Sequence, residues 1–213
     1  MDSGVDDMAD ENLISEIKRK MFHLLGLLYV AGLYFLPRKL FIGIMLGVLA
    51  AEILFELCRL KVPSFNDWLQ NNYGGLFRQE EKNQFSGVVW MAGGVLITAL
   101  LIGPVLPAVT ALLFLILGDS AASLVGKRVR GIRWPNSPKT LSGSLGCFLV
   151  CCGAGLLLLW PQFDWKGILI TALVVTLSEV GYLPLNDNLI VPLAASLAML
   201  VLFNLRPFFL SLF

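Results

Sequence analysis

Charged residues are scarce in this sequence, because Asp, Glu, Lys and Arg together make up only 15% of its 213 residues. Hydrophobic residues make up 57%, and the mean hydropathy is +0.77. Soluble domains carry roughly 25% charged residues, so this composition excludes an ordinary soluble fold. It predicts a multi-pass integral membrane protein in a lipid bilayer. The net charge of +1 hides an asymmetry between an acidic N-terminal stretch and cations at the ends of apolar runs, so the net charge says little about partners. We expect no nucleic-acid partner.

Several familiar motifs are also missing. The four cysteines form no C-x-x-C pair, which argues against a zinc site or a disulfide framework, and we expect them to be packing residues. There is no Walker-type G-x-x-x-x-G-K-[ST] to bind a nucleotide. Residues 1–16 contain six acids and lack the basic start and cleavage site of a signal peptide. We expect them to form an acidic cytoplasmic tail.

Long apolar runs dominate the rest of the chain. Seven of them are long enough to cross about 30 Å of hydrocarbon at about 1.5 Å per residue. They lie at residues 21–36, 40–57, 87–103, 106–123, 142–160, 166–183 and 188–205. We therefore predict an all-α, polytopic transmembrane bundle of about seven spans. Residues 17–213 would form one membrane-embedded catalytic domain.

The distribution of Lys and Arg predicts the orientation of these spans. With the N-terminus in the cytoplasm, twelve of the 16 cations fall on the cytoplasmic side and four on the other. Cytoplasmic loops carry the excess of Lys and Arg, so we expect a cytoplasmic N-terminus. This orientation places the loop at 124–141, the cluster around Arg19 and Lys20, and the turn at 185–188 on one cytoplasmic face.

The loop at 124–141 has the composition of a polyphosphate site. It follows a carboxylate, Asp119, and contains five cations and no acid. The cations are Lys127, Arg128, Arg130, Arg133 and Lys139. Glycines at 126, 131 and 143 let backbone N–H groups approach an anion, and a carboxylate at the rim can hold Mg²⁺. The alternative is a basic cytoplasmic loop that only fixes topology.

Ionisable residues inside the apolar runs are functional candidates, since a charge there costs a few kcal/mol. Glu52 either lines a cavity or makes a hydrogen bond between helices. Glu56 and Arg59 lie three residues apart, and we favour a local ion pair for them. Glu179 and Asp187 flank a helix break at Pro184, which suits the lining of a cavity.

Three polar positions also have a purely structural interpretation. Asp187 or Asn188 could be the N-cap of the last helix, a role that both residue types suit. His23, the single histidine, could be a buried hydrogen-bonding residue, but it shares the predicted inner rim with Arg19 and Lys20 and could therefore contact phosphate or substrate.

The central stretch reads Gly118-Asp119-x-Ala121-Ala122, then Gly126 and Gly131, then Lys139-Thr140-x-x-Gly143-Ser144-x-x-x-Phe148. This pattern resembles the CTP-binding signature of the dolichol kinase, phytol kinase and CTP-dependent diacylglycerol kinase family. Arg19-Lys20-x-x-His23 and Asp187-Asn188-Leu189-x-Val191-Pro192 resemble two further motifs of that family, and the stretch from Arg78 to Gly87 fits less specifically. The resemblance implies a membrane enzyme that transfers the γ-phosphoryl group of CTP to a lipid alcohol.

Roles follow from the residues and from this resemblance together. Asp119, with Glu179 or Asp187, would bind Mg²⁺, and Asp187 or His23 would orient or deprotonate the acceptor hydroxyl. Lys139 would be catalytic and would also bind phosphate. The other expected nucleotide-binding residues are Gly118, Ser120, Gly126, Lys127, Arg128, Gly131, Thr140, Gly143, Ser144 and Asn188. The expected substrate-binding residues are Arg19, Lys20, Glu52 and Arg78.

Two other functions stay open at the level of sequence. The related phosphatidate cytidylyltransferases share the aspartate and the element Ser137-Pro138-Lys139-Thr140, which would make this chain a CDP-lipid synthase. An anion transporter could use the basic loop as a gate, although no inverted repeat is visible. A homodimer is compatible with every one of these functions.

Overall fold

The computed structural model describes residues 17, 19–73, 79–129, 131–182 and 185–211. Within these ranges the protein is helical, with one isolated β-bridge between Arg133 and Thr140, which confirms the predicted all-α class. The acidic tail at 1–16 and the predicted substrate residue Arg78 lie outside the described residues.

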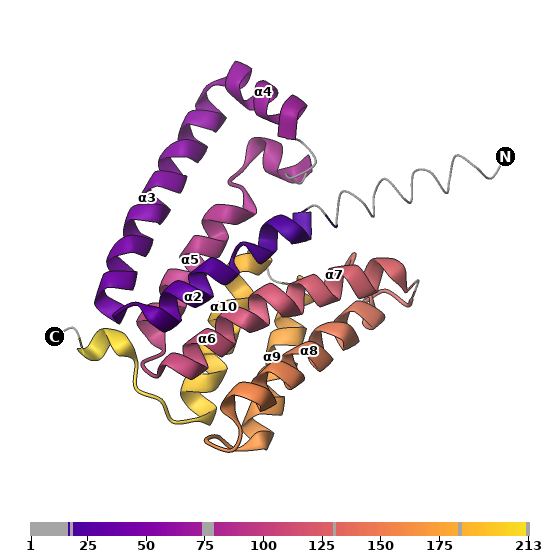
Figure 1. Cartoon of the computed structure of the whole chain (residues 1–213). Helices are drawn as coiled ribbons and strands as arrows, with labels where there is room; N and C mark the ends of the chain where they lie inside the picture. Colours follow the sequence, from indigo (N-terminus) through magenta and orange to yellow (C-terminus); the bar gives the residue numbers. More distant parts are fainter. Residues whose placement is uncertain (1–16, 18, 74–78, 130, 183–184, 212–213) are drawn as a thin grey trace.

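The helices follow one another with short connections (Figure 1). They are α2 (Leu27–Phe35), α3 (Arg38–Lys61), α4 (Pro63–Tyr73), α5 (Gly87–Leu101), α6 (Val105–Leu113), α7 (Asp119–Arg128), α8 (Leu141–Leu159), α9 (Trp165–Glu179) and α10 (Asp187–Leu202). A π-helical turn, η3 (Phe114–Gly118), joins α6 to α7, and η2 (Gln79–Asn83) and η4 (Phe208–Ser211) are short 3₁₀ turns.

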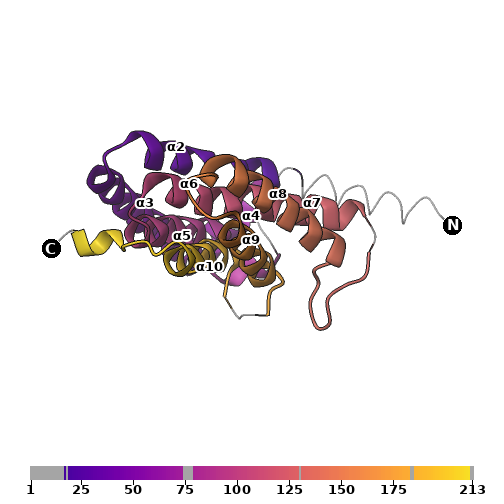
Figure 2. The ribbon, with the colours of Figure 1, turned by 90° about the horizontal axis from the view of Figure 1, so that it is seen from below.

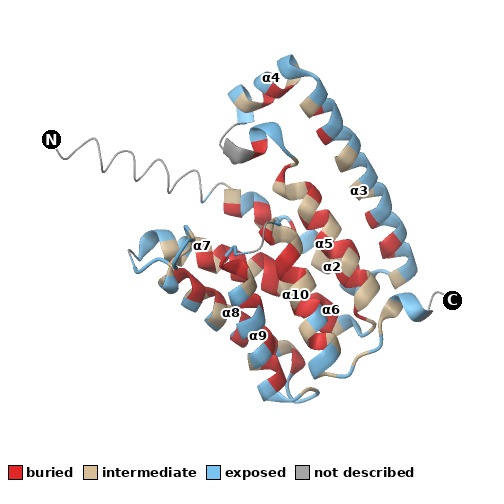
Figure 3. Ribbon diagram, turned by 180° about the vertical axis from the view of Figure 1, so that it is seen from behind, coloured by how far each residue is buried: buried red, intermediate tan, exposed pale blue. Residues whose placement is uncertain are grey.

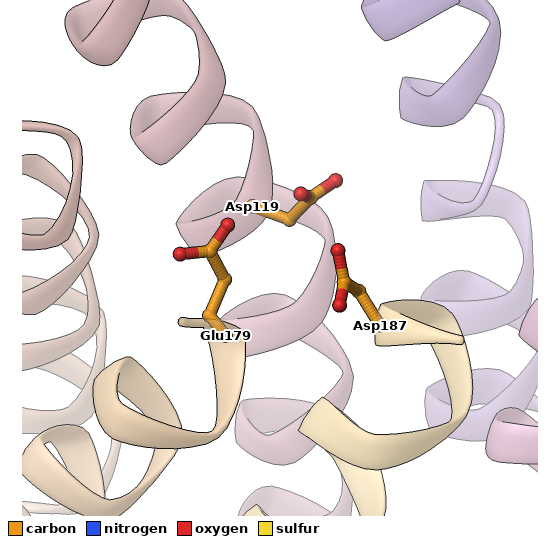
Figure 4. A group of neighbouring side chains, drawn as sticks. All are labelled: Asp119, Glu179 and Asp187. Atoms are coloured by element: carbon orange, nitrogen blue, oxygen red, sulfur yellow. The ribbon is translucent and has the colours of Figure 1, made fainter. Parts of the chain in front are cut away.

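The bundle has two layers. In one layer α5, α10 and α9 are neighbours, and in the other α2 and α8 flank the continuous helix formed by α6, η3 and α7 (Figure 2). Buried residues concentrate in the middle of the bundle, on α5, α6 and α10, whereas α3 is mostly exposed (Figure 3). α3 packs on α5 but leans away from the bundle toward α4, and much of its surface is exposed. The three carboxylates of the candidate site described below lie between the two layers (Figure 4).

Three helices of the described part are long and apolar enough to cross a membrane. They are Arg38–Lys61, Val105–Arg128 and Leu141–Leu159. α5 and α10 are apolar but shorter. The protein is therefore a membrane protein by the composition of its helices, whereas the count of seven spans and the cytoplasmic N-terminus stay predictions.

The first predicted span, 21–36, is not one continuous helix. Residues 19–24 are helical, but a turn at Leu25 and Gly26 separates them from α2. In this turn the amide N–H groups of Leu25 and Gly26 donate to the carbonyls of Phe22 and His23, three residues back. Such tight turns interrupt an α-helix and often mark functional positions. Here the interruption lies three residues after His23.

The helix that carries Asp119 extends further than its hydropathy predicts. α7 continues through Arg128, so the predicted loop at 124–141 is helical in its first five residues and the connection to α8 is residues 129–140. Lys127 and Arg128 occupy the last turn of α7. Cations are favourable at this end, where the helix dipole is negative, which explains why the helix does not stop at the first charge.

Candidate active site

Three carboxylates from three helices meet between the two layers. Asp119 begins α7, Glu179 ends α9 and Asp187 begins α10, and their side chains point toward one another (Figure 4). All three are buried, and one oxygen of each lies within 4.8 Å of one oxygen of both others. We call Asp119, Glu179 and Asp187 the acidic triad.

The ends of two helices position two members of the triad. α9 stops at Glu179, and Gly181 follows with a φ of +85°, a conformation that glycine adopts without strain. α10 starts after Asn186, whose side-chain oxygen accepts a hydrogen bond from the Asn188 amide. The N-cap is therefore Asn186, and the interpretation of Asp187 or Asn188 as the cap is wrong. Asp187 is left available for the triad.

Two lysines and the histidine surround the triad. Lys20 pairs with Asp119, and Lys139 pairs with Glu179 and lies 2.9 Å from Asp187. The His23 Nε2 atom is 3.6 Å from an oxygen of Asp119. Burial lowers the pKa of Lys139, but the carboxylates of Glu179 and Asp187 outweigh burial and hold that pKa above its ordinary value. Lys139 is therefore cationic at neutral pH.

The triad keeps unused acceptor capacity. Within the described part of the chain, buried oxygens of Asp119 (Oδ1) and Glu179 (Oε2) have no hydrogen-bond partner. Buried polar atoms without partners are rare in native proteins and call for an explanation such as an ion. Carboxylate oxygens are the ligands that Mg²⁺ prefers, usually together with phosphate oxygens and water. The three carboxylates therefore fit Mg²⁺ as a donor set.

The connection from α7 to α8 is ordered by hydrogen bonds to α9 and α8. The Ser137 hydroxyl donates to the carbonyl of Val180 at 2.6 Å and accepts from the Lys139 amide. The indole of Trp134 donates to the Ser144 hydroxyl at 2.9 Å. These contacts anchor the segment just before Lys139 and hold its ammonium group at the triad.

Other predicted nucleotide residues lie close by and have local structural contacts. Thr140 is the N-cap of α8 and accepts from the Gly143 amide at 3.1 Å. A side chain on Gly143 would come within 2.6 Å of the Ala122 carbonyl, so this glycine lets α8 approach α7 closely at Gly126. The Ser120 hydroxyl donates to Ile116 in the preceding turn. Nucleotide binding by these residues stays a prediction.

A cavity of about 450 Å³ opens beside the triad, between the N-terminal helix, α3, α5 and α7. Its polar lining includes Arg19, Lys20, His23, Glu52, Asp119 and Asn188. Apolar side chains, among them Phe22, Phe55, Val89 and Met91, form much of the rest. The predicted phosphate and substrate residues on the first helix and on α3 thus face one space that also reaches Asp119.

Some contacts of this cavity had no signal in the sequence. The Tyr29 hydroxyl lies 3.4 Å from an oxygen of Glu52 and joins α2 to α3. The Asn188 amide group donates to the Gly87 carbonyl at 2.8 Å, so Asn188 closes the cavity against α5 rather than reaching the basic connection. Both contacts join residues far apart in the chain, which local patterns do not reveal.

Comparison with known proteins identifies the family. The chain is 31% identical over 158 residues to the CTP-dependent diacylglycerol kinase 1 of Schizosaccharomyces pombe, a match that covers 66% of this chain and 71% of that protein. The chain belongs to the polyprenol kinase-like family of lipid kinases. It also matches the dolichol kinase of Saccharomyces cerevisiae with 42% identity over 88 residues, 36% of this chain and 16% of that kinase.

A third relative of this lipid kinase is an archaeal protein. It is an uncharacterized protein of Methanocaldococcus jannaschii, 28% identical over 180 residues, or 83% of this chain and 88% of the relative. No family model and no solved structure matches the chain. The assignment to the polyprenol kinase-like family therefore depends on similarity to individual kinases.

Proposed function

We propose that this protein is a CTP-dependent lipid-alcohol kinase that transfers the γ-phosphoryl group of CTP to the hydroxyl of a membrane lipid. The acceptor would be an isoprenoid alcohol, such as a polyprenol, dolichol or phytol, or diacylglycerol. CTP and the alcohol give CDP, a lipid monophosphate and one proton. Similarity to a dolichol kinase and to a CTP-dependent diacylglycerol kinase supports this class of reaction, and the second of these relatives is named for its use of CTP.

One observation carries the proposal. Asp119 connects the acidic triad to a largely apolar cavity, because it lines that cavity and pairs with Lys20, while Lys139 pairs with Glu179 and Asp187. Phosphoryl transfer needs mainly positioning and neutralisation of phosphate charge. A lipid acceptor needs an apolar cavity that reaches the same place. The geometry supports a site for both substrates.

Asp119, Glu179 and Asp187 would hold Mg²⁺, which when bound neutralises the phosphate oxygens. With the triad engaged in this way, the ammonium groups of Lys20 and Lys139 would be available to bind phosphate. Lys127 and Arg128, on the last turn of α7, add positive charge on the side of the α7–α8 connection. We place this site on the cytoplasmic face, where CTP is available.

The acceptor hydroxyl must lose its proton as its oxygen attacks phosphorus. His23 lines the cavity, and within the described residues its Nε2 atom has no hydrogen-bond partner. Asp187, in contrast, would be occupied as a ligand of Mg²⁺. We therefore propose that His23 Nε2, rather than Asp187, accepts the proton that the acceptor hydroxyl loses.

The test is the fate of γ-labelled CTP when purified protein in detergent receives Mg²⁺ and one lipid at a time. The panel is polyprenol, phytol, farnesol, diacylglycerol and phosphatidate, and ATP and GTP replace CTP in parallel samples. We expect label in a lipid monophosphate, with CTP preferred. Label released as pyrophosphate with phosphatidate would identify a cytidylyltransferase instead. No turnover with any pair would refute the kinase assignment.

A further inference from the structure

The cavity beside the triad contains a carboxylate that the proposed chemistry does not use. Glu52 projects from α3 into this cavity. Its Oε1 atom is 3.4 Å from the Tyr29 hydroxyl, which donates to it, whereas its Oε2 atom is buried and has no partner among the residues that the structure describes. A buried acceptor without a partner destabilises the folded protein, so a ligand is the natural source of the missing hydrogen bond.

Glu56 lies one helical turn further along α3 and lines the same cavity, and it is an example of a carboxylate with a structural role. Its oxygens accept hydrogen bonds from Arg59 and from the amide and hydroxyl of Ser86. Glu52 has no such cation, since no Lys or Arg of the described ranges forms an ion pair with it. Contacts within the protein therefore account for the buried carboxylate of Glu56, but they do not account for that of Glu52.

The two sides of the cavity differ in charge. Lys20 and His23 lie on the side of Asp119, and Glu52 lies on α3. An ionised carboxylate accepts a hydrogen bond from a hydroxyl, but it repels a phosphate oxygen. The side near the triad therefore suits the phosphates of a nucleotide, and the side at Glu52 suits a neutral group that donates a hydrogen bond.

We propose that Glu52, oriented by Tyr29, accepts a hydrogen bond from the hydroxyl group of the acceptor lipid when the lipid first binds, before this hydroxyl turns its proton to His23 for transfer, and that Glu52 thereby makes the cavity select neutral lipid alcohols over lipid phosphates. This inference rests on the proposed kinase function, and it names the property of the acceptor that the site recognises. It also assigns Glu52 a part in product release, because the new phosphate monoester carries negative charge beside this carboxylate. A phosphatidate headgroup is disfavoured for the same reason.

The variant Glu52→Gln keeps the shape of the side chain and can still accept from Tyr29, but it has no charge. A hydrogen bond to a charged group corresponds to a factor of about 10 to 100 in affinity. We expect the KM for the lipid alcohol to rise by about that factor, while the KM for the nucleotide stays the same. Tyr29→Phe should act in the same direction with a smaller factor. Asp67→Asn, a carboxylate on exposed α4 outside the cavity, is the matched control.

Binding measurements separate this inference from the kinase function. Equilibrium binding to purified protein in detergent is compared within two pairs, farnesol with farnesyl monophosphate and dioleoylglycerol with dioleoyl phosphatidate. The wild type should prefer the neutral member of the pair that it binds, and Glu52→Gln should lose about tenfold or more of that preference. If this holds in a protein without turnover, the inference stands and the kinase function fails. Equal binding of both members, no binding of either pair, or an unchanged preference in Glu52→Gln would overturn the inference.

Discussion

Two clusters of buried charges lie about the same cavity, and they differ in how completely their atoms are hydrogen-bonded. The first, around Arg59, is saturated. Its guanidinium group donates to Glu56, to Asn66 and to the carbonyls of Glu81 and Gln84, and the whole residue is 0% exposed. The second is the acidic triad, in which two buried oxygens lack partners within the described residues.

This difference is the one that we expect between a structural cluster and a proposed catalytic site. Saturation means that the buried charges of the Arg59 cluster need no ligand, and its bonds join α3, α4 and the segment from Glu81 to Ser86 into one unit. The triad brings three carboxylates together, an arrangement that like-charge repulsion opposes unless cations are present. Its lysines supply part of that charge, and a metal ion would supply the rest.

The largest effect should come from removing the centre of the saturated cluster. Arg59→Met leaves the buried carboxylate of Glu56 without its cation, which we expect to lower the free energy of unfolding by about 3–5 kcal/mol. Thermal unfolding in detergent measures this loss. The double variant Glu56→Gln with Arg59→Met should recover part of it, because no buried charge remains. Unchanged stability with lost turnover would instead make the Arg59 cluster functional.

For the acidic triad we expect a substitution to lower the rate of turnover rather than the stability of the protein. Asp119→Asn should lower kcat by more than about 100-fold, since even the groups that only orient metal ligands contribute factors of about 10–100. Steady-state turnover of CTP with the best lipid acceptor measures this. Asp164→Asn is the matched control, because Asp164 is exposed and its side chain makes no capping bond to α9. Turnover by Asp119→Asn at the rate of the wild type would remove Asp119 from the metal site.

Sequence patterns found the triad but not the saturated network, for a physical reason. An acid in an apolar segment is conspicuous wherever it lies, so Asp119, Glu179 and Asp187 could be singled out one by one. The pair of Glu56 and Arg59 was predicted correctly because its spacing of three residues is local. Asn66 and the backbone acceptors of Arg59 come from separate segments, and no local pattern joins them.

Local sequence patterns also predict the fold only in part, because they do not reveal contacts between distant segments. Hydropathy predicted an all-helical protein, but it misplaced helix ends where polar residues continue a helix, as at Lys127, or where backbone bonds interrupt one, as at Gly26. Arg38 is a further example of a contact that the sequence does not reveal. It lies between the predicted spans 21–36 and 40–57 and would therefore be expected in a connecting turn. Its guanidinium group in fact donates to the carbonyls of Ala99 and Ile102 at the end of α5. Tertiary contacts of this kind satisfy helix termini, and they are invisible along the chain.

Magnesium alone should distinguish the two clusters without any turnover. If the triad binds Mg²⁺ in the folded state only, the ion stabilises the protein by about 2.7 kcal/mol at 100 times its dissociation constant. We expect the midpoint of thermal unfolding to rise with Mg²⁺ in the wild type and in Arg59→Met, but not in Asp119→Asn. An equal rise in Asp119→Asn would show that the ion binds elsewhere.

The smallest expected effect comes from removing a single hydrogen-bond partner of Arg59. It tests whether the Arg59 cluster contributes to stability alone. Asn66 accepts from Arg59 at 2.9 Å and donates to the carbonyl of Lys82 at 3.0 Å, and it does not line the cavity. Asn66→Ala removes one bond to a buried cation and should cost about 2 kcal/mol of stability, measured by thermal unfolding in detergent. Activity per folded molecule and the Mg²⁺ shift should not change, because the triad is untouched. A lost Mg²⁺ shift would couple the two clusters, and the saturated cluster would then belong to the site that it adjoins.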